Sequence, residues 1–161
     1  MAKDKYPVTP ATRLLNKEKV EFTSHLYEYQ ERGGTAASSR ELGVDEHVVI
    51  KTIVLEDESK NPIIVLMHGD LQVSTRSLAR LLGVKSVSPC SPDTAAKHTG
   101  YLVGGTSPFG TRKVIPVYME ETILELPKIF INGGKRGFLV GMGPKDIVRI
   151  LKPEIVRVGV S

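Results

Sequence analysis

The fold class is decided by one stretch of sequence, Val48-Val49-Ile50-Lys51-Thr52-Ile53-Val54-Leu55, and by its continuation in Pro62-Ile63-Ile64-Val65-Leu66-Met67. Apart from Lys51 and Thr52, the first run is apolar and mostly β-branched, and the second repeats that composition, which is typical of buried strands. A charged loop containing Asn61 separates the two runs. The sequence therefore predicts two strands joined as a hairpin.

Helix signals lie on both sides of this hairpin. Thr9-Pro10 begins a predicted helix over 10–18, and Ser74 caps a second one that ends at Gly83. The second helix is predicted to place Leu78, Leu81 and Leu82 on one face, and Arg76 and Arg80, four residues apart, on another.

The first of the remaining predicted elements is a β-rich run over 22–30, which is followed by a break at Gly33-Gly34. The others are helical turns from 38 to 43 and from 45, a strand over 84–87, a helix over 91–98, strands over 114–119, 128–131 and 138–141, a helix over 144–151 and a strand over 155–160. Asn132-Gly133-Gly134 is predicted to be a tight turn. Interspersed hairpins and unequal helices favour a single α+β domain over residues 1–161, with a mixed, largely antiparallel sheet and surrounding helices.

Composition sets the broad class. The 161 residues are 40% hydrophobic and 25% charged, and the one cysteine excludes an internal disulfide. Apolar runs such as 63–67 are far shorter than the roughly 20 residues that cross a bilayer, and residues 1–10 lack the apolar stretch of a secretory signal. We therefore expect a cytoplasmic protein without a membrane partner. A net charge of 22 − 18 = +4 allows an acidic partner without requiring one.

Lys51 is the most conspicuous candidate for chemistry because it interrupts an apolar strand. Isolated lysines are seldom fully buried unless they are paired. One interpretation is a lysine of an edge strand whose ammonium reaches water. The other is a cation held at a cleft, where it binds a phosphate or polarises an ester carbonyl.

A glycine-rich loop is the second candidate. Residues 100–110, GYLVGGTSPFG, contain four glycines, which let backbone N–H groups approach a ligand closely, and a proline that stiffens the loop. The loop matches neither the Walker A pattern nor GxGxxG, so the sequence gives no support for a nucleoside triphosphate or a dinucleotide. The alternative is a rigid corner between strands.

The remaining reactive residues form no recognisable constellation. Cys90 precedes a predicted helix, a position that lowers a thiol pKa, but no histidine can be assigned to it, and packing is the simpler role. The histidines His25, His47, His68 and His98 are scattered without metal-ligand spacing. We therefore expect no metal, no cofactor and no conventional triad, and a chemistry that depends on positioning and backbone donors.

Two basic pairs follow glycine-rich segments, Arg112-Lys113 and Lys135-Arg136. They are candidates for contact with a phosphate backbone, or they only solubilise the loop ends. Without tryptophan, and with aromatic residues mostly single, the chain has no evident platform for stacking a long single strand, so a short nucleic-acid end fits better.

Taken together, these stretches resemble one family, the YbaK/EbsC-type aminoacyl-tRNA deacylases, which are relatives of the editing domain of bacterial prolyl-tRNA synthetases. The matching stretches occur in the family's order over nearly the whole chain: Thr9-Pro10-Ala11 with Leu14-Leu15, Lys51-Thr52, Thr99 to Gly105 with Ser107-Pro108 and Gly110, and Gly133-Gly134-Lys135-Arg136-Gly137. The resemblance implies that family's fold, with a barrel-like core.

The resemblance also implies an activity, hydrolysis in trans of the ester between a mischarged amino acid and the 3′ end of a tRNA, most typically cysteine on tRNA(Pro). In cysteine-specific members the substrate's own thiol is thought to attack the carbonyl. Lys51 is similar to the family's essential lysine, and Gly104 belongs with it at the catalytic centre. The implied substrate-binding residues are Tyr27, Gly105, Thr106, Ser107, Pro108, Phe109 and Gly110.

One departure from the family concerns Leu139, which follows Phe138 where many members have an acidic residue. Without that carboxylate, a contact to the substrate's ammonium is missing. The resemblance therefore leaves open which amino acid is preferred. The alternatives are another small aminoacyl-tRNA such as Ala-tRNA(Pro), with water as the nucleophile, or a non-catalytic module that binds tRNA ends or a synthetase. Prolyl-tRNA synthetase is the partner that the resemblance suggests.

Overall fold

A computed structural model describes residues 6–161, and its centre is the predicted hairpin. Strand β2 (Val49–Asp57) pairs antiparallel with β3 (Pro62–His68) from Ile50↔His68 to Glu56↔Pro62. Side chains alternate between the two faces of the pair. Ile50 and Ile64 belong to the larger apolar cluster, whereas Leu55 belongs to the second.

Around the hairpin the sheet is mixed, as predicted. Its strand order is β1 (Thr23–Leu26), β8 (Phe138–Met142), β7 (Ile129–Lys135), β2, β3, β6 (Val117–Glu120) and β9 (Glu154–Val156), and β5 (Val87–Pro89) also pairs with β2. The pairs β1–β8, β7–β8, β2–β3 and β2–β5 are antiparallel, and β2–β7, β3–β6 and β6–β9 are parallel. A separate antiparallel pair joins β4 (Gln72–Val73) to β10 (Gly159–Val160).

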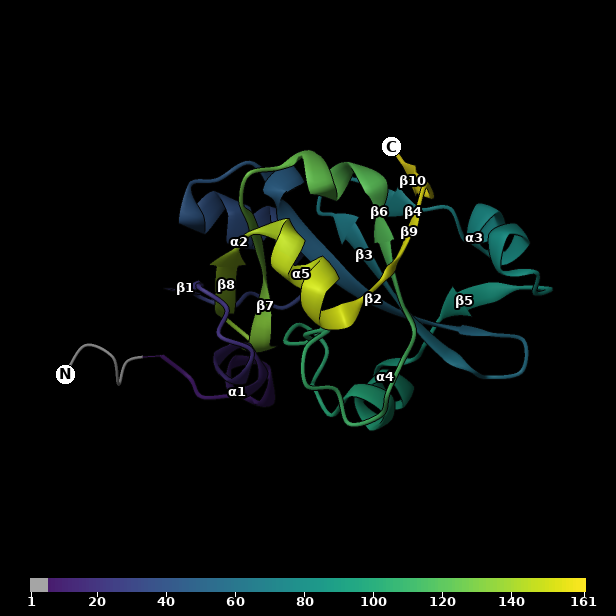
Figure 1. The fold of residues 1–161 in the computed structure, drawn as a ribbon, viewed down its shortest axis with the longest axis horizontal. Helices are drawn as coiled ribbons and strands as arrows, with labels where there is room; N and C mark the ends of the chain where they lie inside the picture. The colour runs from purple at the N-terminus through teal and green to yellow at the C-terminus, as the bar shows by residue number, and fades with distance from the viewer. Residues whose placement is uncertain (1–5) are drawn as a thin grey trace.

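From residue 6 onwards, five α-helices pack on this sheet: α1 (Pro10–Lys17), α2 (Gly34–Leu42), α3 (Thr75–Leu82), α4 (Pro92–Thr99) and α5 (Pro144–Leu151). Figure 1 shows α5 in front of the sheet and α3 at the opposite end of the molecule from α1. The described part of the chain also contains two short 3₁₀ turns, η2 (Glu46–Val48) and η3 (Glu121–Glu125). Within residues 6–161, none of the helices combines the length and the apolar character that a membrane span needs.

Sequence signals placed most helix ends correctly. The Thr9 and Ser74 side chains accept hydrogen bonds from the N–H groups of Thr12 and Ser77, and Gly83 ends α3 in the left-handed conformation. One face assignment was wrong, because Leu81 is 48% exposed while Leu78 is fully buried.

Other predicted boundaries need correction. The break at Gly33-Gly34 is the start of α2, because Gly33 is its N-cap. The strand predicted over 84–87 lies at 87–89, and the last predicted strand is two strands with different partners, β9 and β10. The Asn132-Gly133-Gly134 segment is not a turn but a bulged part of β7, since the Asn132 side chain accepts hydrogen bonds from the N–H groups of Gly134 and Lys135.

The sheet is split at one place beside β2. One edge of β2 pairs with β7 at Val49 and Ile50 and with β5 from Leu55 to Asp57. Between these two ladders, residues 51–54 have no strand partner on that edge among residues 6–161, and the Cys90 N–H donates to the Val54 carbonyl at 3.1 Å. Lys51 and Thr52 therefore lie at an opening in the sheet.

Candidate functional site

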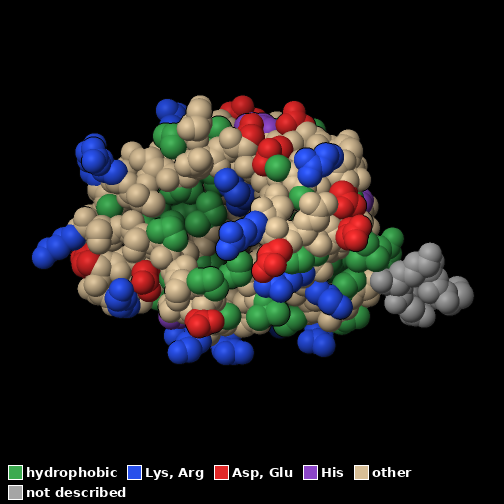
Figure 2. All heavy atoms as spheres, turned by 180° about the vertical axis from the view of Figure 1, so that it is seen from behind, with side chains coloured by type: hydrophobic (Ala, Val, Ile, Leu, Met, Phe, Trp, Pro, Cys, Tyr) green, Lys and Arg blue, Asp and Glu red, His purple; other side chains and the backbone are tan. Residues whose placement is uncertain are grey.

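A cavity of about 650 Å³ occupies this opening. Its walls come from β2, the segment between β1 and α2, the first half of α2, the start of α4, the glycine-rich loop and the β7–β8 hairpin. The lining includes Tyr27, Tyr29, Glu31, Arg32, Thr35, Lys51, Thr52, Cys90, Val103, Gly104, Thr106, Asn132, Arg136 and Leu139. Figure 2 shows the face opposite to that of Figure 1, where hydrophobic side chains line a hollow beside Lys and Arg side chains.

Lys51 is the lysine of this cavity, and it is half-buried. Its ammonium donates a hydrogen bond to the Leu71 carbonyl. Burial lowers the pKa of Lys51 from its usual value of 10.5, and the nearby carboxylates of Glu46 and Asp70 oppose that shift. The side chain is thus a cation with a fixed partner and with donors left for an anionic ligand.

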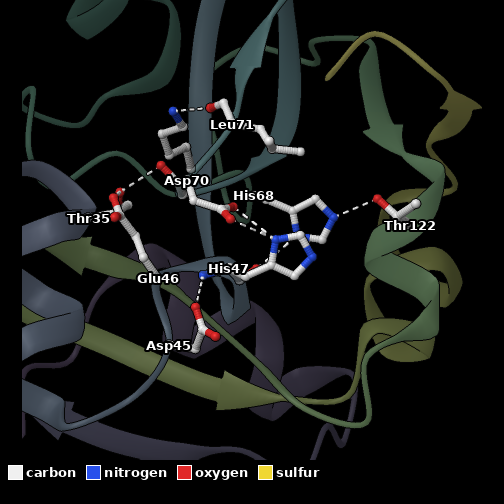
Figure 3. A network of polar contacts seen from close by, with 10 residues as sticks. Thr35, Asp45, Glu46, His47, His68, Asp70, Leu71 and Thr122 are labelled. Atoms are coloured by element: carbon white, nitrogen blue, oxygen red, sulfur yellow. Dashed lines mark hydrogen bonds and ion pairs between the residues drawn. The ribbon is translucent and has the colours of Figure 1, made fainter. Parts of the chain in front are cut away.

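A network of polar contacts surrounds the turn after β3 that carries the Leu71 carbonyl (Figure 3). The one hydroxyl proton of Thr35 has two acceptors within reach, Glu46 Oε2 at 2.7 Å and the Gly69 carbonyl at 3.2 Å from Oγ1. His47 Nδ1 lies 2.9 Å from Asp70 Oδ1. These bonds fix the turn after β3 and so fix the acceptor of Lys51.

Beneath this turn two histidine rings are stacked. The centroids of His47 and His68 are 3.7 Å apart with an interplanar angle of 4°. His68 is fully buried, and its Nδ1 lies 2.8 Å from the His47 carbonyl while its Nε2 lies 2.7 Å from Thr122 Oγ1. Because the carbonyl only accepts, His68 Nδ1 carries the proton and Thr122 donates to Nε2.

This cluster also brings metal-ligating atoms together, since ligand atoms of His47, His68 and Asp70 lie within 4.8 Å of one another. A single ion cannot lie in the planes of two rings that are parallel and stacked, and both His68 nitrogens are already hydrogen-bonded. The arrangement is therefore a structural hydrogen-bond network. No local sequence pattern predicts this network, because the two histidines are 21 residues apart.

Thr52 has the one buried side-chain oxygen or nitrogen without a hydrogen-bond partner among residues 6–161. It lines the cavity, at the split in the sheet. Alternation along β2 also turns the Thr52 backbone N–H and C=O to the same edge as the Val54 carbonyl, which is the open edge. Buried polar groups are normally paired, so this hydroxyl is a candidate contact for a bound ligand.

Gly104 belongs to another wall of the cavity, the one formed by the glycine-rich loop. Its φ is +89°, and a Cβ at this position would lie 2.6 Å from the Tyr29 hydroxyl. The Gly104 carbonyl accepts from the Asn132 side chain at 3.0 Å. Only glycine fits here, so the loop backbone itself forms the surface of the cavity.

The rest of the predicted loop site is arranged differently from expectation. Thr106 lines the cavity, but Gly105, Ser107, Pro108 and Phe109 are buried in the protein and Gly110 faces away from the lining. Phe109 is fully buried in the larger apolar cluster, and the Ser107 hydroxyl accepts from its N–H at 3.1 Å.

Two glycines of this loop are required by packing. A Cβ at Gly105 would lie 2.7 Å from the Arg136 backbone nitrogen, and one at Gly110 would lie 2.7 Å from the Pro10 carbonyl oxygen. These residues build the loop and do not face the cavity.

Among the predicted aromatic and basic residues, Tyr27 and Arg136 line the cavity. The Arg136 guanidinium lies 5.0 Å from the centroid of the Tyr29 ring, and its Nε donates to the Val103 carbonyl at 2.8 Å, which ties the loop to the β7–β8 turn. The other predicted basic residues, Arg112, Lys113 and Lys135, are exposed outside the lining. Arg32 and Tyr29 are cavity residues that the sequence had not singled out for a role.

Cys90 lines the cavity without being activated. Burial, together with the carboxylate of Glu56, raises its pKa to about 11, where a helix start had suggested a lowered value. Its sulfur lies 3.8 Å from Glu56 Oε2. A thiol with this pKa is protonated near neutral pH and is a poor nucleophile.

The charged side chains that line the cavity are mostly basic. Lys51, Arg32 and Arg136 are cations, and Glu31 is the acid among the lining residues. Leu139 is 4% exposed and forms an apolar part of the wall. The cavity thus offers cations for a phosphate, an apolar wall for a small side chain and one carboxylate near the mouth.

Comparison with known proteins assigns a family to this geometry. Residues 31–150 match the family described as the aminoacyl-tRNA editing domain. The chain belongs to the aminoacyl-tRNA editing domain family. The matched range contains β2, the glycine-rich loop and the β7–β8 hairpin, so it includes most of the cavity wall.

Two sequence relatives of this editing domain are informative. A protein of Enterococcus faecalis, provisionally named Cys-tRNA(Pro)/Cys-tRNA(Cys) deacylase EbsC, is 28% identical over 151 residues, which are 93% of this chain and 92% of that protein. A proline–tRNA ligase of Brachyspira hyodysenteriae is 29% identical over 86 residues, which cover 53% of this chain and 15% of the ligase.

Solved structures show the same fold. A candidate trans-editing enzyme for prolyl tRNA synthetase superposes with a TM-score of 0.81 at 18% identity, and the match covers 96% of this chain and all of the other, 100%. The crystal structure of a hypothetical protein gives a TM-score of 0.86 at 20% identity, covering 94% of this chain and 99% of that one. The resemblance in sequence and the expected fold are therefore confirmed.

Proposed function

We propose that this editing domain acts in trans as a deacylase of Cys-tRNA(Pro). The observation that carries the proposal is the lining of the cavity, in which Lys51 and the Gly104 backbone lie together without an activated nucleophile, since the Cys90 thiol has a raised pKa. The relative named as a Cys-tRNA(Pro)/Cys-tRNA(Cys) deacylase, which matches this chain over 93% of its length, supports the choice of substrate.

In the proposed reaction the substrate supplies its own nucleophile. The cysteinyl sulfur attacks the ester carbonyl carbon, the bond to the ribose oxygen breaks, and the thiol proton ends on that oxygen. The products are a tRNA with a free 3′ end and a cyclic thioester of cysteine, which water then opens. The protein has only to orient the ester and to exclude water from it.

Each wall has a role in this proposal. The Lys51 ammonium binds the phosphate of the terminal adenosine or the ester region, where a fixed cation stabilises developing negative charge. The Gly104 backbone positions the aminoacyl group, and Tyr27 and Thr106 form the adjoining surface. Glu31, as the acid of the lining, is the available partner for the substrate ammonium in place of the residue that Leu139 replaces.

A second candidate substrate is Ala-tRNA(Pro). The apolar wall at Leu139 favours it, because that wall accepts a methyl group as well as a thiol. Alanine has no thiol, so this reaction requires water as the nucleophile.

Prolyl-tRNA synthetase is the proposed protein partner, on the support of the ligase match.

The experiment compares three esters of the same tRNA(Pro), carrying cysteine, S-methylcysteine and alanine. We expect fast loss of cysteine and loss of the other two at the uncatalysed rate, because methylation removes the nucleophile. Equal cleavage of all three would show that water attacks and would favour the second candidate. Salt-sensitive tRNA binding without any cleavage would show a binding module instead.

A further inference from the structure

A second hollow, of about 400 Å³, lies between α3 and β5, outside the cavity. Arg76, Arg80 and Lys85 line it, and all three are exposed. Arg76 and Arg80 are four residues apart on α3, so they lie on one face of the helix. We call this hollow the α3 groove.

The three cations of the α3 groove are not neutralised by acidic side chains. None of them forms an ion pair with a residue in the range 6–161. One carboxylate contacts the groove backbone, that of Glu58, whose Oε1 accepts from the Lys85 N–H at 3.1 Å and from the Ser86 N–H at 3.4 Å. Three cations against one carboxylate leave the groove positive. Figure 2 shows Lys and Arg side chains projecting at the left, the side on which α3 lies after the half-turn from Figure 1.

One strand connects this groove to the cavity. Val87 lines the α3 groove, and β5 runs from it to Pro89, directly before Cys90 in the cavity lining. Three residues of extended chain span about 10 Å. That distance corresponds to about three nucleotides of a stacked strand at roughly 3.4 Å each.

We propose that the α3 groove binds phosphates of the RNA strand whose 3′ end occupies the cavity. The inference rests on the proposed function, because it takes the ester at Lys51 as the end of that strand. Two guanidinium groups on one helix face are suited to phosphate oxygens, which they bind through paired N–H donors. The groove thereby supplies affinity for the tRNA without touching the ester.

The test compares two double variants with equal loss of charge. Arg76→Gln/Arg80→Gln removes two cations from the groove, and Arg13→Gln/Lys17→Gln removes two exposed cations with the same spacing from α1, at the other end of the molecule. The measurement is the dissociation constant of uncharged tRNA(Pro) at several salt concentrations. We expect the groove variant to bind about tenfold or more weakly, with a log–log salt slope reduced by about 1.4 to 1.8, and the α1 variant to bind like the wild type.

Two further measurements separate this inference from the proposed function. Lys85→Gln removes one cation of the groove that lies outside α3. It is expected to lower the salt slope by about half as much as the Arg76→Gln/Arg80→Gln variant, and this effect cannot come from a change in the folding of α3. The cysteinyl ester of adenosine, which has no phosphate, is expected to be cleaved by the groove variant at the wild-type rate.

Unchanged tRNA affinity and salt slope in the groove variants would overturn the inference even where Cys-tRNA(Pro) is hydrolysed. If the groove variants bind tRNA more weakly but the wild-type protein cleaves neither Cys-tRNA(Pro) nor the cysteinyl ester of adenosine, the groove is supported and the proposed function is contradicted. The two ideas therefore fail by different results.

Discussion

The two walls of the cavity differ in how they are built. The glycine-rich loop is fixed from within, since Phe109 is buried in the core and the Tyr101 hydroxyl donates to the Phe109 carbonyl at 2.6 Å. The β2 wall is the reverse, because Lys51 and Thr52 lie where one edge of the strand has no neighbour, and the Thr52 hydroxyl has no partner among residues 6–161. The loop is therefore a rigid wall that offers its backbone at Gly104, and the strand carries the polar side chains that are available to a ligand.

The largest effect is expected from breaking this rigid wall at Phe109. Phe109→Ala removes a fully buried ring and should lower the free energy of unfolding by about 3–5 kcal/mol. Leu102→Ala, on the same loop but 66% exposed, should change it by less than about 0.5 kcal/mol. Chemical denaturation measures both. Similar losses in the two variants would contradict the view that the loop is anchored through Phe109.

Gly104→Ala should break the contact between the glycine-rich loop and the Tyr29 ring. The added Cβ would lie 2.6 Å from the Tyr29 hydroxyl at a φ of +89°, so the loop must shift, and a displacement of about 1 Å is enough to lower the deacylation rate roughly 10²-fold.

Gly83→Ala is the matched control for this change. Gly83 has a φ of +71° but open space around its Cβ position, so the substitution adds backbone strain without a collision. We expect a stability loss of about 1–2 kcal/mol and an unchanged rate. A normal rate for Gly104→Ala would show that the loop backbone does not position the substrate.

Thr52→Val tests the strand wall with a smaller effect. Valine keeps the shape and removes the unpartnered hydroxyl, so the free energy of unfolding should stay equal or rise. Loss of one hydrogen bond to the substrate should lower the deacylation rate about 2- to 10-fold. Thr94→Val is the control, because Thr94 lies outside the lining and its hydroxyl accepts from Ser91 at 2.9 Å. Equal rates for Thr52→Val and the wild type would remove Thr52 from the site.

The smallest effect concerns the network behind Lys51. Burial lowers the pKa of His68 below its usual value of 6.5, and the groups that face it are His47, Asp70 and Glu120. At a pH between these two pKa values, His68 carries a proton in the unfolded chain but not in the folded one. The free energy of unfolding must therefore fall as the pH drops from about 7.5 through 6.5 towards the lowered pKa. We expect a shallower loss in His68→Gln, measured by denaturation at each pH. An identical pH dependence in both proteins would contradict the neutral state of His68.

Local signals account for much of what the sequence predicted. The central hairpin and α5 follow from β-branched runs and from Pro144 at the helix start, and α3 follows from its caps. Errors arose where single residues act against the usual meaning of a local pattern. Asn132 continues β7 through a bulge by capping two N–H groups, and glycine at positions 33 and 34 begins a helix where a break was expected.

The candidate site was only partly predictable. Lys51, Gly104, Tyr27, Thr106 and Arg136 were singled out and do line one cavity. The split beside Thr52 depends on the parallel pairing of β2 with β7, whose paired residues Val49 and Phe130 are 81 positions apart, and no local pattern reports such a contact.

The most direct test of the central role of Lys51 is the single-turnover rate of ester loss from Cys-tRNA(Pro). Lys51→Ala is compared with Lys60→Ala, which removes an exposed lysine from the tip of the same hairpin. We predict a loss of about 10²-fold or more for Lys51→Ala, as for removal of a preorganised charged group, and the wild-type rate for Lys60→Ala. Equal rates in all three proteins would contradict the assignment of Lys51 as the central cation of the site.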